Sequence, residues 1–217
     1  MRLYLIRHGQ TPANVEGRLA TAAPGPGLTE RGVEQAAALP AALADAGIEE
    51  IRVSTLVRTH LTAAPLAASL GLTPVVDGGF REIEAGDLED ATDEESYKLF
   101  LDPIYAWVAG DLSPRIPGGP SGVEFFARYD AAVASLAATG IAVGAVVSHG
   151  AAIRIWASAQ DPALPAAFLT THNLDNTGIV ALDGSPSEGW RIASWAGDPV
   201  GGETLADAAA PDPTGQR

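Results

Sequence analysis

Short apolar runs alternate along this chain with segments that carry helix-start signals. Residues 3–6, 51–54 and 143–148 have the apolar character of buried strands, and a helical pattern follows each of them. Such alternation favours a largely parallel sheet with helices on both faces, because parallel strands need crossover connections. Two of these strands run directly into a histidine and a glycine, at His8 and His149. Since ligand sites lie outside the carboxyl ends of such strands, we expect both histidines at one edge of the sheet.

Capping residues mark the helices between the strands. Thr11 and Pro12 are typical of an N-cap and a first helical position. Thr29 is expected to cap a second helix, which we expect Gly47 to end. The apolar and small face of that helix is predicted to comprise Val33, Ala36, Ala37 and Leu43.

The remaining elements follow from similar signals. A third helix is predicted over residues 57–70, where Gly71 follows the last apolar residue. A capping box, in which a serine and a glutamate three positions later cap each other's backbone, opens a helix at Ser121 that we expect to reach about residue 139. Further strands are predicted at residues 73–76, 177–182 and 190–195.

The middle and the end of the chain differ from this regular pattern. Residues 82–117 are acidic and irregular, and we interpret them as an excursion over the sheet rather than a second domain. The aromatic residues of this segment, interpreted as local packing, are Tyr97, Phe100, Tyr105 and Trp107. The predicted organisation is one α/β domain over residues 1–198 with a cap insertion at about 82–120. Residues 199–217 contain no aromatic side chain, and we expect a disordered tail there.

Composition excludes several classes of function. The formal net charge of −14 argues against a broad surface for nucleic acid or anionic membrane. The absence of cysteine excludes disulfides, thiolate zinc sites and cysteine nucleophiles. Four histidines are too few for a histidine-rich metal cluster, and His60 and His172 are interpreted as structural or solvent-facing. Residues 1–8 are too short an apolar start for a signal peptide, and no later stretch approaches a membrane span, so we expect a cytoplasmic protein without a metal site.

The residues expected at the sheet edge suit a phosphate group. Arg7 precedes His8 at the end of the first strand, and Arg58 follows the second strand after a short turn. A planar guanidinium can donate two parallel hydrogen bonds to phosphate oxygens, so two arginines could hold that group. Gly9 would let the backbone approach the anion, and the helix that opens at Thr11 could add free N–H groups. The pattern therefore indicates an oxyanion site.

His8 is the candidate nucleophile of this site. A single histidine at a strand end is most often a structural residue, but two such strand ends together favour chemistry. Imidazole accepts a phosphoryl group near neutral pH when a neighbour holds its other ring N–H. Arg7, Arg58 and His149 could then stabilise charge on the equatorial oxygens. Glu82 is the candidate that protonates the leaving alkoxide, since burial and a bound phosphate dianion would raise the pKa of its carboxyl group.

Five segments of the chain stand in the order of a known family's signature blocks. They are Leu5-Ile-Arg-His-Gly-Gln-Thr-Pro-Ala-Asn14, Gly27-Leu-Thr-Glu-Arg-Gly32 with Gln35-Ala36, Ser54-Thr-Leu-Val-Arg58-Thr with Thr62-Ala63, Arg81-Glu82 with Gly86-Asp-Leu-Glu89, and Val147-Ser-His149-Gly150. Taken together over about residues 2–182, they resemble the histidine phosphatase superfamily, the phosphoglycerate mutase-like proteins.

The resemblance implies a fold and a set of roles. The fold would be a three-layer α/β/α sandwich with a mostly parallel mixed sheet and an inserted cap. The activity would be phosphoryl transfer through a phosphohistidine on His8, without metal or cofactor. The implied roles are Arg7, Arg58 and His149 as phosphate ligands, Glu82 as the acid, and Gln10, Asn14 and Gly150 as substrate-binding residues.

Two departures from the family pattern bear on the activity. Family members often carry Gly-Glu-Ser where this chain has Gly119-Pro120-Ser121, so we expect one contact at the rim of the site to be missing. Mutases of the family typically add basic residues in the cap to hold the phosphoglycerate carboxylate. Between residues 82 and 117 this chain has only Lys98 and Arg115 as basic residues, which favours water as the final phosphoryl acceptor.

The leading hypothesis is therefore a phosphomonoesterase that acts on a small phosphorylated metabolite. A phosphoglycerate mutase, an isomerase that returns the phosphoryl group to its substrate, is the second hypothesis. The third is a non-catalytic module that binds a phosphate ligand. The joint presence of five residues argues against it, namely Arg7, His8, Arg58, Glu82 and His149. The expected partners are a small phosphorylated metabolite or inorganic phosphate, without nucleic acid or membrane, and a homodimer is left open.

Overall fold

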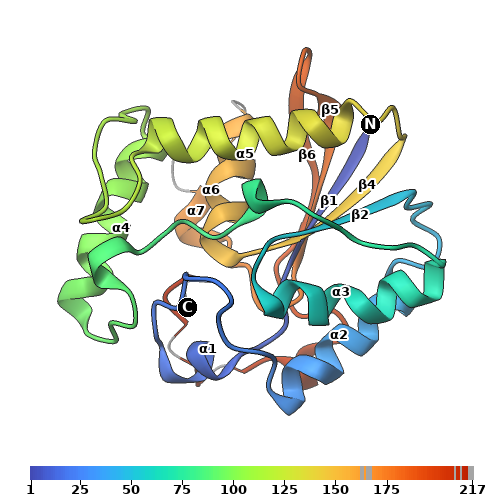
Figure 1. Ribbon diagram of the computed structural model, residues 1–217, viewed down its shortest axis with the longest axis horizontal. Helices are drawn as coiled ribbons and strands as arrows, with labels where there is room; N and C mark the ends of the chain where they lie inside the picture. Colours follow the sequence, from blue (N-terminus) through green and yellow to red (C-terminus); the bar gives the residue numbers. More distant parts are fainter. Residues whose placement is uncertain (162–163, 165–167, 208, 211, 215–217) are drawn as a thin grey trace.

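The computed structural model describes residues 1–161, 164, 168–207, 209–210 and 212–214, whose strands form one six-stranded sheet (Figure 1). The strands are β1 (Arg2–Arg7), β2 (Glu50–Val53), β3 (Val75–Val76), β4 (Val143–Ser148), β5 (Ile179–Ser185) and β6 (Gly189–Ala196). Their order across the sheet is β3-β2-β4-β1-β5-β6. The first four of that order are parallel, whereas β5 runs antiparallel to β1 and β6 runs antiparallel to β5. The sheet is therefore mixed and mostly parallel, as predicted.

Helices cover both faces of this sheet. They are α1 (Pro12–Glu16), α2 (Glu30–Ala42), α3 (Val57–Leu70), α4 (Glu94–Val108), α5 (Gly122–Ala137), α6 (Gly150–Gln160) and α7 (Phe168–Thr171), with short 3-10 turns at Gly78–Phe80, Gly86–Leu88 and Glu203–Leu205. α2 and α3 pack together on one face, and α5 and α6 lie on the other (Figure 1). The predicted three-layer arrangement is confirmed. None of the helices in the described residues is long and apolar enough to cross a membrane.

Successive residues of β1 contribute to two separate cores. Ile6 belongs to the apolar cluster that includes Leu39 of α2. Leu5 belongs to the cluster on the opposite face, with Leu136 of α5. Side chains along a strand point alternately to the two faces, so burial on both sides fixes β1 from above and below. His8 directly follows this strand, so its backbone is attached to a rigid part of the fold.

The helix that follows Thr29 is shorter than predicted. Thr29 caps it as expected, with its side chain accepting a hydrogen bond from the N–H of Gly32. The helix ends at Ala42, and Leu43 serves as the C-cap. Gly47 lies in the turn beyond the helix, where its φ of 69° is a left-handed conformation that favours glycine. The prediction that Gly47 ends the helix is therefore wrong.

The buried face of α2 also differs from the prediction. Val33, with 57% of its surface exposed, and Ala37 face solvent rather than the sheet. Close backbone packing explains the difference, because a Cβ atom on Gly32 would lie 2.2 Å from the backbone oxygen of Gln10. The close contact between the backbones of Gly32 and Gln10 places the side of the helix that carries Gly32 against the domain. The buried residues of the helix are Gly32, Gln35, Ala36 and Leu39.

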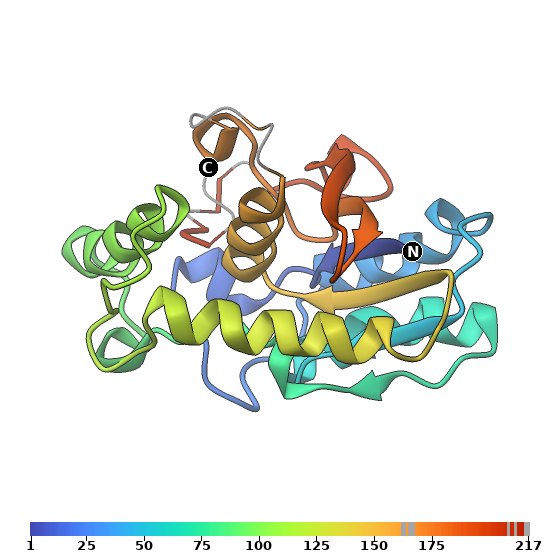
Figure 2. The same cartoon turned by 90° about the horizontal axis from the view of Figure 1, so that it is seen from above.

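The cap insertion contains a helix where the sequence analysis predicts irregular structure. Asp93 caps α4 by accepting a hydrogen bond from the N–H of Ser96. The helix buries residues about one turn apart, namely Phe100, Ile104 and Trp107. Trp107 stacks on Phe125 of α5 with 5.9 Å between ring centroids, so Trp107 packs within this region as expected, whereas Tyr105 is exposed. Figure 2 shows α4 beyond one end of α5, away from the strands.

The described residues after position 198 contact the domain at the end of β1. Gln35 of α2 donates a hydrogen bond of 2.8 Å to the backbone oxygen of Leu205. Asp212 forms an ion pair with Arg7, whose sequence position is 205 residues away. Where the sequence favours a disordered tail, the structure thus places described tail residues against the sheet edge. An ion pair at such separation leaves no local pattern in the sequence.

Candidate active site

The two strand-end histidines meet, as the topology predicts. Arg7 and Ser148 are paired at the ends of β1 and β4, and the N–H of His8 donates a hydrogen bond of 3.0 Å to the backbone oxygen of Ser148. The rings of His8 and His149 lie with their centroids 5.3 Å apart, and both side chains are buried. The parallel register therefore brings two imidazoles together at one edge of the sheet.

The tautomer of His8 follows from its hydrogen bond. Its Nδ1 lies 2.8 Å from the backbone oxygen of Gly9, which can only accept, so Nδ1 carries the proton and Nε2 keeps a free lone pair. Burial lowers the pKa of His8 well below its usual value, and the charges of Arg58 and Arg7 lower it further. His8 is therefore a neutral imidazole with Nε2 available to a ligand.

Arg58 contributes hydrogen-bond donors that the described protein does not use. It stands in the first turn of α3, and its Nη2 donates a hydrogen bond of 3.0 Å to the backbone oxygen of Ala20. Its Nε and Nη1 are buried and have no partner among the described residues. Burial, aided by the charge of Arg7, lowers the pKa of the guanidinium to about 10. Unpaired buried donors are rare in proteins, and here they indicate a place for an anion.

His149 resembles Arg58 in this respect. Its Nε2 lies 2.8 Å from the hydroxyl of Ser54, at the end of β2, while its buried Nδ1 has no partner in the described chain. Burial lowers the pKa of His149 well below its usual value, and the charge of Arg58 adds to this effect. An arriving anion would oppose this shift by favouring the protonated ring.

Glu82 lies against the beginning of α6. Its Oε1 accepts hydrogen bonds from the N–H groups of Ile83 (2.9 Å) and Ala152 (2.8 Å), and its Oε2 accepts one from Ala151 (3.2 Å). Burial raises the pKa of this carboxyl group, whereas the three N–H donors and the charge of Arg58 oppose the increase. Burial has the larger effect, which is the direction that a proton donor requires.

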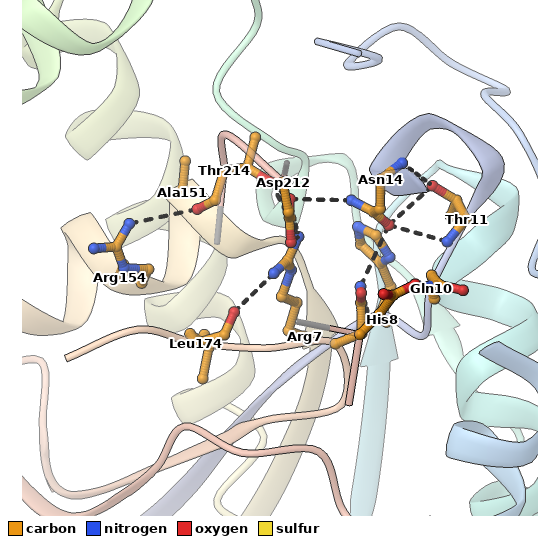
Figure 3. Close-up of polar contacts among 12 residues, drawn as sticks. Arg7, His8, Gln10, Thr11, Asn14, Ala151, Arg154, Leu174, Asp212 and Thr214 are labelled. Atoms are coloured by element: carbon orange, nitrogen blue, oxygen red, sulfur yellow. Dashed lines mark hydrogen bonds and ion pairs between the residues drawn. The ribbon is translucent and has the colours of Figure 1, made fainter. Parts of the chain in front are cut away.

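Arg7 is bonded to the C-terminal segment, by which we mean the described residues 199–207, 209–210 and 212–214 (Figure 3). Its Nη1 donates a hydrogen bond of 2.7 Å to the backbone oxygen of Leu174. Its Nη2 lies 2.6 Å from a carboxylate oxygen of Asp212 and 3.1 Å from the hydroxyl of Thr214. Only the buried Nε lacks a partner among the described residues. A Cβ atom on Gly150 would lie 2.9 Å from this Nε, so the glycine leaves the space that the guanidinium fills.

The other two predicted substrate-binding residues also contact the C-terminal segment. Gln10 donates a hydrogen bond of 2.9 Å to Asp207. Asn14 donates one of 3.2 Å to Asp212, the partner of Arg7. Asn14 lines the same cavity as His8, whereas Gln10 does not. The structure thus brings Asn14 into the site and turns Gln10 towards the segment that covers it.

The cavity beside His8 is small in this structure. His8, Asn14, Arg58 and Glu82 line it together with Thr214 of the C-terminal segment. Its volume is about 10 Å³, which holds about one water molecule. Of the predicted catalytic residues, His8, Arg58 and Glu82 therefore line one cavity, whereas Arg7 and His149 lie outside its lining, and the C-terminal segment narrows the space.

Two expected backbone contributions have other roles. The N–H of Gly9 donates a hydrogen bond to the hydroxyl of Thr62, and a Cβ atom on Gly9 would lie 2.6 Å from the backbone oxygen of Gly32. Gly9 thus permits close packing of two backbone segments instead of contact with an anion. At the start of α1, the N–H groups of Thr11 and Asn14 are already bonded, because each side chain accepts a hydrogen bond from the other residue's backbone in a capping box.

Sequence reasoning missed several residues of this region. Asp212 and Thr214 belong to a segment without any regular pattern, so no local signal could have found them. Thr21 also lines the cavity, and its hydroxyl and backbone N–H are both bonded to the carboxylate of Glu89. His60 lies outside the cavity, with its Nε2 2.8 Å from the backbone oxygen of Ser54, which agrees with a structural role. His172 is stacked on Phe168, also away from the cavity. In the described chain, no group of three or more His, Cys, Asp or Glu residues could hold a metal ion.

The arrangement suits the binding of a tetrahedral oxyanion and its transfer. Nε2 of His8 is a free nitrogen nucleophile on rigid backbone, and the unpaired donors of Arg58 and the unpaired Nδ1 of His149 lie beside it. Donors of this kind stabilise charge that develops on equatorial oxygens during transfer. Glu82 adds a carboxyl group in the same cavity.

Comparison with known proteins agrees with this geometry. Residues 3–198 match the family described as histidine phosphatase superfamily (branch 1). A probable phosphoglycerate mutase GpmB of Salmonella paratyphi B is 31% identical over 229 residues, which cover 98% of each chain. The PE-PGRS family protein PE_PGRS11 of Mycobacterium tuberculosis is 38% identical over 219 residues, which cover 94% of this chain but only 38% of that longer protein.

Solved structures support the same assignment. A mycobacterial glucosyl-3-phosphoglycerate phosphatase, determined as a complex with VO3, superposes with a TM-score of 0.75 and 28% sequence identity. The superposition covers 91% of this chain and 99% of that chain. With the family match, the full-length relative and the shared fold in agreement, the chain belongs to the histidine phosphatase superfamily.

Proposed function

We propose that this protein is a phosphomonoesterase that hydrolyses a small phosphorylated metabolite through a phosphohistidine on His8. One observation carries the proposal. The hydrogen bond from Nδ1 to the oxygen of Gly9 leaves Nε2 of His8 free, next to the unpaired buried donors of Arg58 and the unpaired Nδ1 of His149. A nitrogen nucleophile and unsatisfied anion donors in one cavity are what phosphoryl transfer to histidine requires.

In the first step, the lone pair on Nε2 of His8 forms a bond to phosphorus while the bond from phosphorus to the ester oxygen breaks. The electron pair of that bond leaves with the oxygen, and Glu82 supplies the proton that converts the alkoxide to an alcohol. Arg58 and His149 donate hydrogen bonds to the equatorial oxygens, and Arg7 provides a second guanidinium. General acid catalysis of this kind contributes about 10²- to 10⁴-fold to a rate.

In the second step, water replaces the alcohol. Its oxygen attacks phosphorus, the bond between phosphorus and Nε2 breaks, and the electron pair returns to the imidazole. Glu82, now a carboxylate, accepts the proton that water loses. The products are inorganic phosphate and the resting His8. The two steps are complete without a metal or a cofactor.

A phosphoglycerate mutase is the second candidate, because the full-length relative named above is described as a probable mutase. The cap argues against it. Its two basic residues between positions 82 and 117 already have carboxylate partners, Lys98 with Asp102 and Arg115 with Glu124. A mutase must hold its phosphoglycerate in place so that the phosphoryl group can return to it. Both of these basic side chains are already paired with carboxylates of the protein.

The test is an assay for released phosphate across a panel of phosphomonoesters, with a coupled assay for interconversion of 3- and 2-phosphoglycerate run in parallel. The proposal predicts phosphate release from at least one small ester, and a His8→Ala variant serves as the blank. Interconversion that proceeds faster than phosphate release would identify a mutase. Binding of inorganic phosphate without turnover of any ester would identify a non-catalytic module.

A further inference from the structure

Arg128 of α5 connects that helix to the segment that carries Glu82. Its Nη1 donates hydrogen bonds to the backbone oxygens of Gly79 (2.7 Å) and Arg81 (3.0 Å). Its Nη2 donates to the backbone oxygen of Glu82 at 3.0 Å and lies 3.3 Å from a carboxylate oxygen of Glu84. One planar guanidinium thus spans three carbonyl groups and one carboxylate, a geometry that lysine cannot reproduce.

The segment held by Arg128 has little regular structure of its own. Glu82 lies between the 3-10 turns Gly78–Phe80 and Gly86–Leu88, outside every helix and strand. Its carboxyl group is fixed by the N–H groups of Ala151 and Ala152 at the start of α6. Its backbone is fixed from the opposite side by Arg128. Glu82 is thereby held at both ends, once by α6 and once by α5.

Other contacts support the rest of this segment. The hydroxyl of Ser148 donates a hydrogen bond of 2.9 Å to the backbone oxygen of Phe80, and the N–H of Ala85 donates one of 2.9 Å to the hydroxyl of Thr21. The backbone oxygen of Glu82 itself is bonded to Arg128. Removal of the guanidinium would therefore loosen the residue that bears the carboxyl group more than the ends of the segment.

We propose that Arg128 is a positioning residue for Glu82, which it keeps in place to deliver a proton to the leaving group. The inference rests on the proposed function, because it assigns Arg128 to the step in which Glu82 acts. Arg128 does not line the cavity beside His8 and does not touch the reacting atoms. A displacement of about 1 Å of a catalytic group can cost about 100-fold in rate, so a residue that acts only on position has a measurable effect.

The test compares two substrates whose leaving groups differ in their need for a proton. An alkyl phosphate releases a strongly basic alkoxide, whereas p-nitrophenyl phosphate releases a stable phenolate. Glu82→Gln should lose about 10²- to 10⁴-fold in kcat on the alkyl phosphate and far less on the aryl phosphate. Arg128→Met, which keeps an unbranched stem as far as the position of Nε but removes the donors, should show the same selectivity with a loss of about 10- to 100-fold on the alkyl phosphate.

The double variant sharpens the test. Because both changes act on one proton transfer, Glu82→Gln with Arg128→Met should be no slower on the alkyl phosphate than Glu82→Gln alone. Arg115→Met is the matched control, since Arg115 also bonds to a backbone oxygen and a glutamate but contacts neither Glu82 nor the cavity. It should leave both rates unchanged. Arg128→Lys keeps the charge and tests the same selectivity if Arg128→Met does not fold.

Any one of four results would overturn the inference. Equal losses on both substrates would make Arg128 a purely structural residue, and so would additive losses in the double variant. If Glu82→Gln is selective for the alkyl phosphate and neither Arg128 variant is, only the role of Arg128 fails. If Glu82→Gln itself affects both substrates equally, the proton-donor role of Glu82 fails, and the inference fails with it.

Discussion

The ion pair between Arg7 and Asp212 leads us to a quantitative prediction about the affinity for phosphate. Both side chains are buried, and a carboxylate oxygen of Asp212 lies 2.6 Å from Nη2 of Arg7. Asn14 donates a further hydrogen bond to the same carboxylate. If Arg7 holds phosphate through Nη2, that nitrogen must give up this carboxylate, so Asp212 competes with the ligand within the same molecule.

Asp212→Asn isolates this competition because it keeps the shape of the side chain and removes its charge. A charge-assisted hydrogen bond exceeds a neutral one by about 1–2 kcal/mol. Since each 1.4 kcal/mol changes an equilibrium tenfold, the dissociation constant of inorganic phosphate should fall by about 5- to 30-fold in the variant. The KM for a phosphomonoester should fall in the same direction.

The assay is titration calorimetry with inorganic phosphate at neutral pH, repeated at high salt. Asp198→Asn is the matched control, because Asp198 is exposed and its replacement changes the net charge equally without contact to Arg7. The control should leave the affinity unchanged. Weaker phosphate binding in Asp212→Asn would refute the reasoning, since Asp212 would then orient Arg7 for the ligand instead of competing with it.

Three further predictions concern pH and metals. Because burial raises the pKa of Glu82, its protonated form persists above the usual carboxyl pH range. The kcat on an alkyl phosphate should therefore decrease as pH rises through that pKa. A pH profile of Glu82→Gln should lack this decrease. The pKa of His8 is lowered, so its neutral form should persist below the usual histidine range, and activity on p-nitrophenyl phosphate, which does not need the acid, should persist there too. Because Arg7, Arg58 and His149 supply the positive charge in the proposed mechanism, hydrolysis should survive excess chelator. Loss of activity in EDTA that Mg²⁺ or Zn²⁺ restores would instead favour metal-activated water.

Local sequence signals predicted the elements whose ends depend on single residues. α3 begins at Val57 and ends at Leu70, as predicted, because Gly71 adopts the left-handed backbone (φ 66°) that ends a helix. The capping box at Ser121 opens α5 as predicted. The convergence of His8 and His149 followed from topology alone, since carboxyl ends of parallel strands share an edge.

Features that depend on tertiary contacts were not predictable in this way. Acidic composition obscured α4, whose apolar residues are stabilised by packing that includes Trp107 against Phe125 of α5. The orientation of α2 depends on the close approach of Gly32 to the backbone of Gln10, which no helical periodicity encodes. The contact between Asp212 and Arg7 joins opposite ends of the chain. In each case the deciding partner is distant in sequence.

The covalent intermediate tests the central claim most directly. The protein is mixed briefly with substrate, quenched in base without exposure to acid, digested, and analysed by mass spectrometry for a phosphorylated peptide that contains His8. The account predicts an acid-labile, base-stable phosphate on His8, and a His8→Ala variant that lacks the adduct and loses about a thousandfold or more in kcat. A phosphate found on another residue, or hydrolysis by His8→Ala at near wild-type rate, would contradict the account.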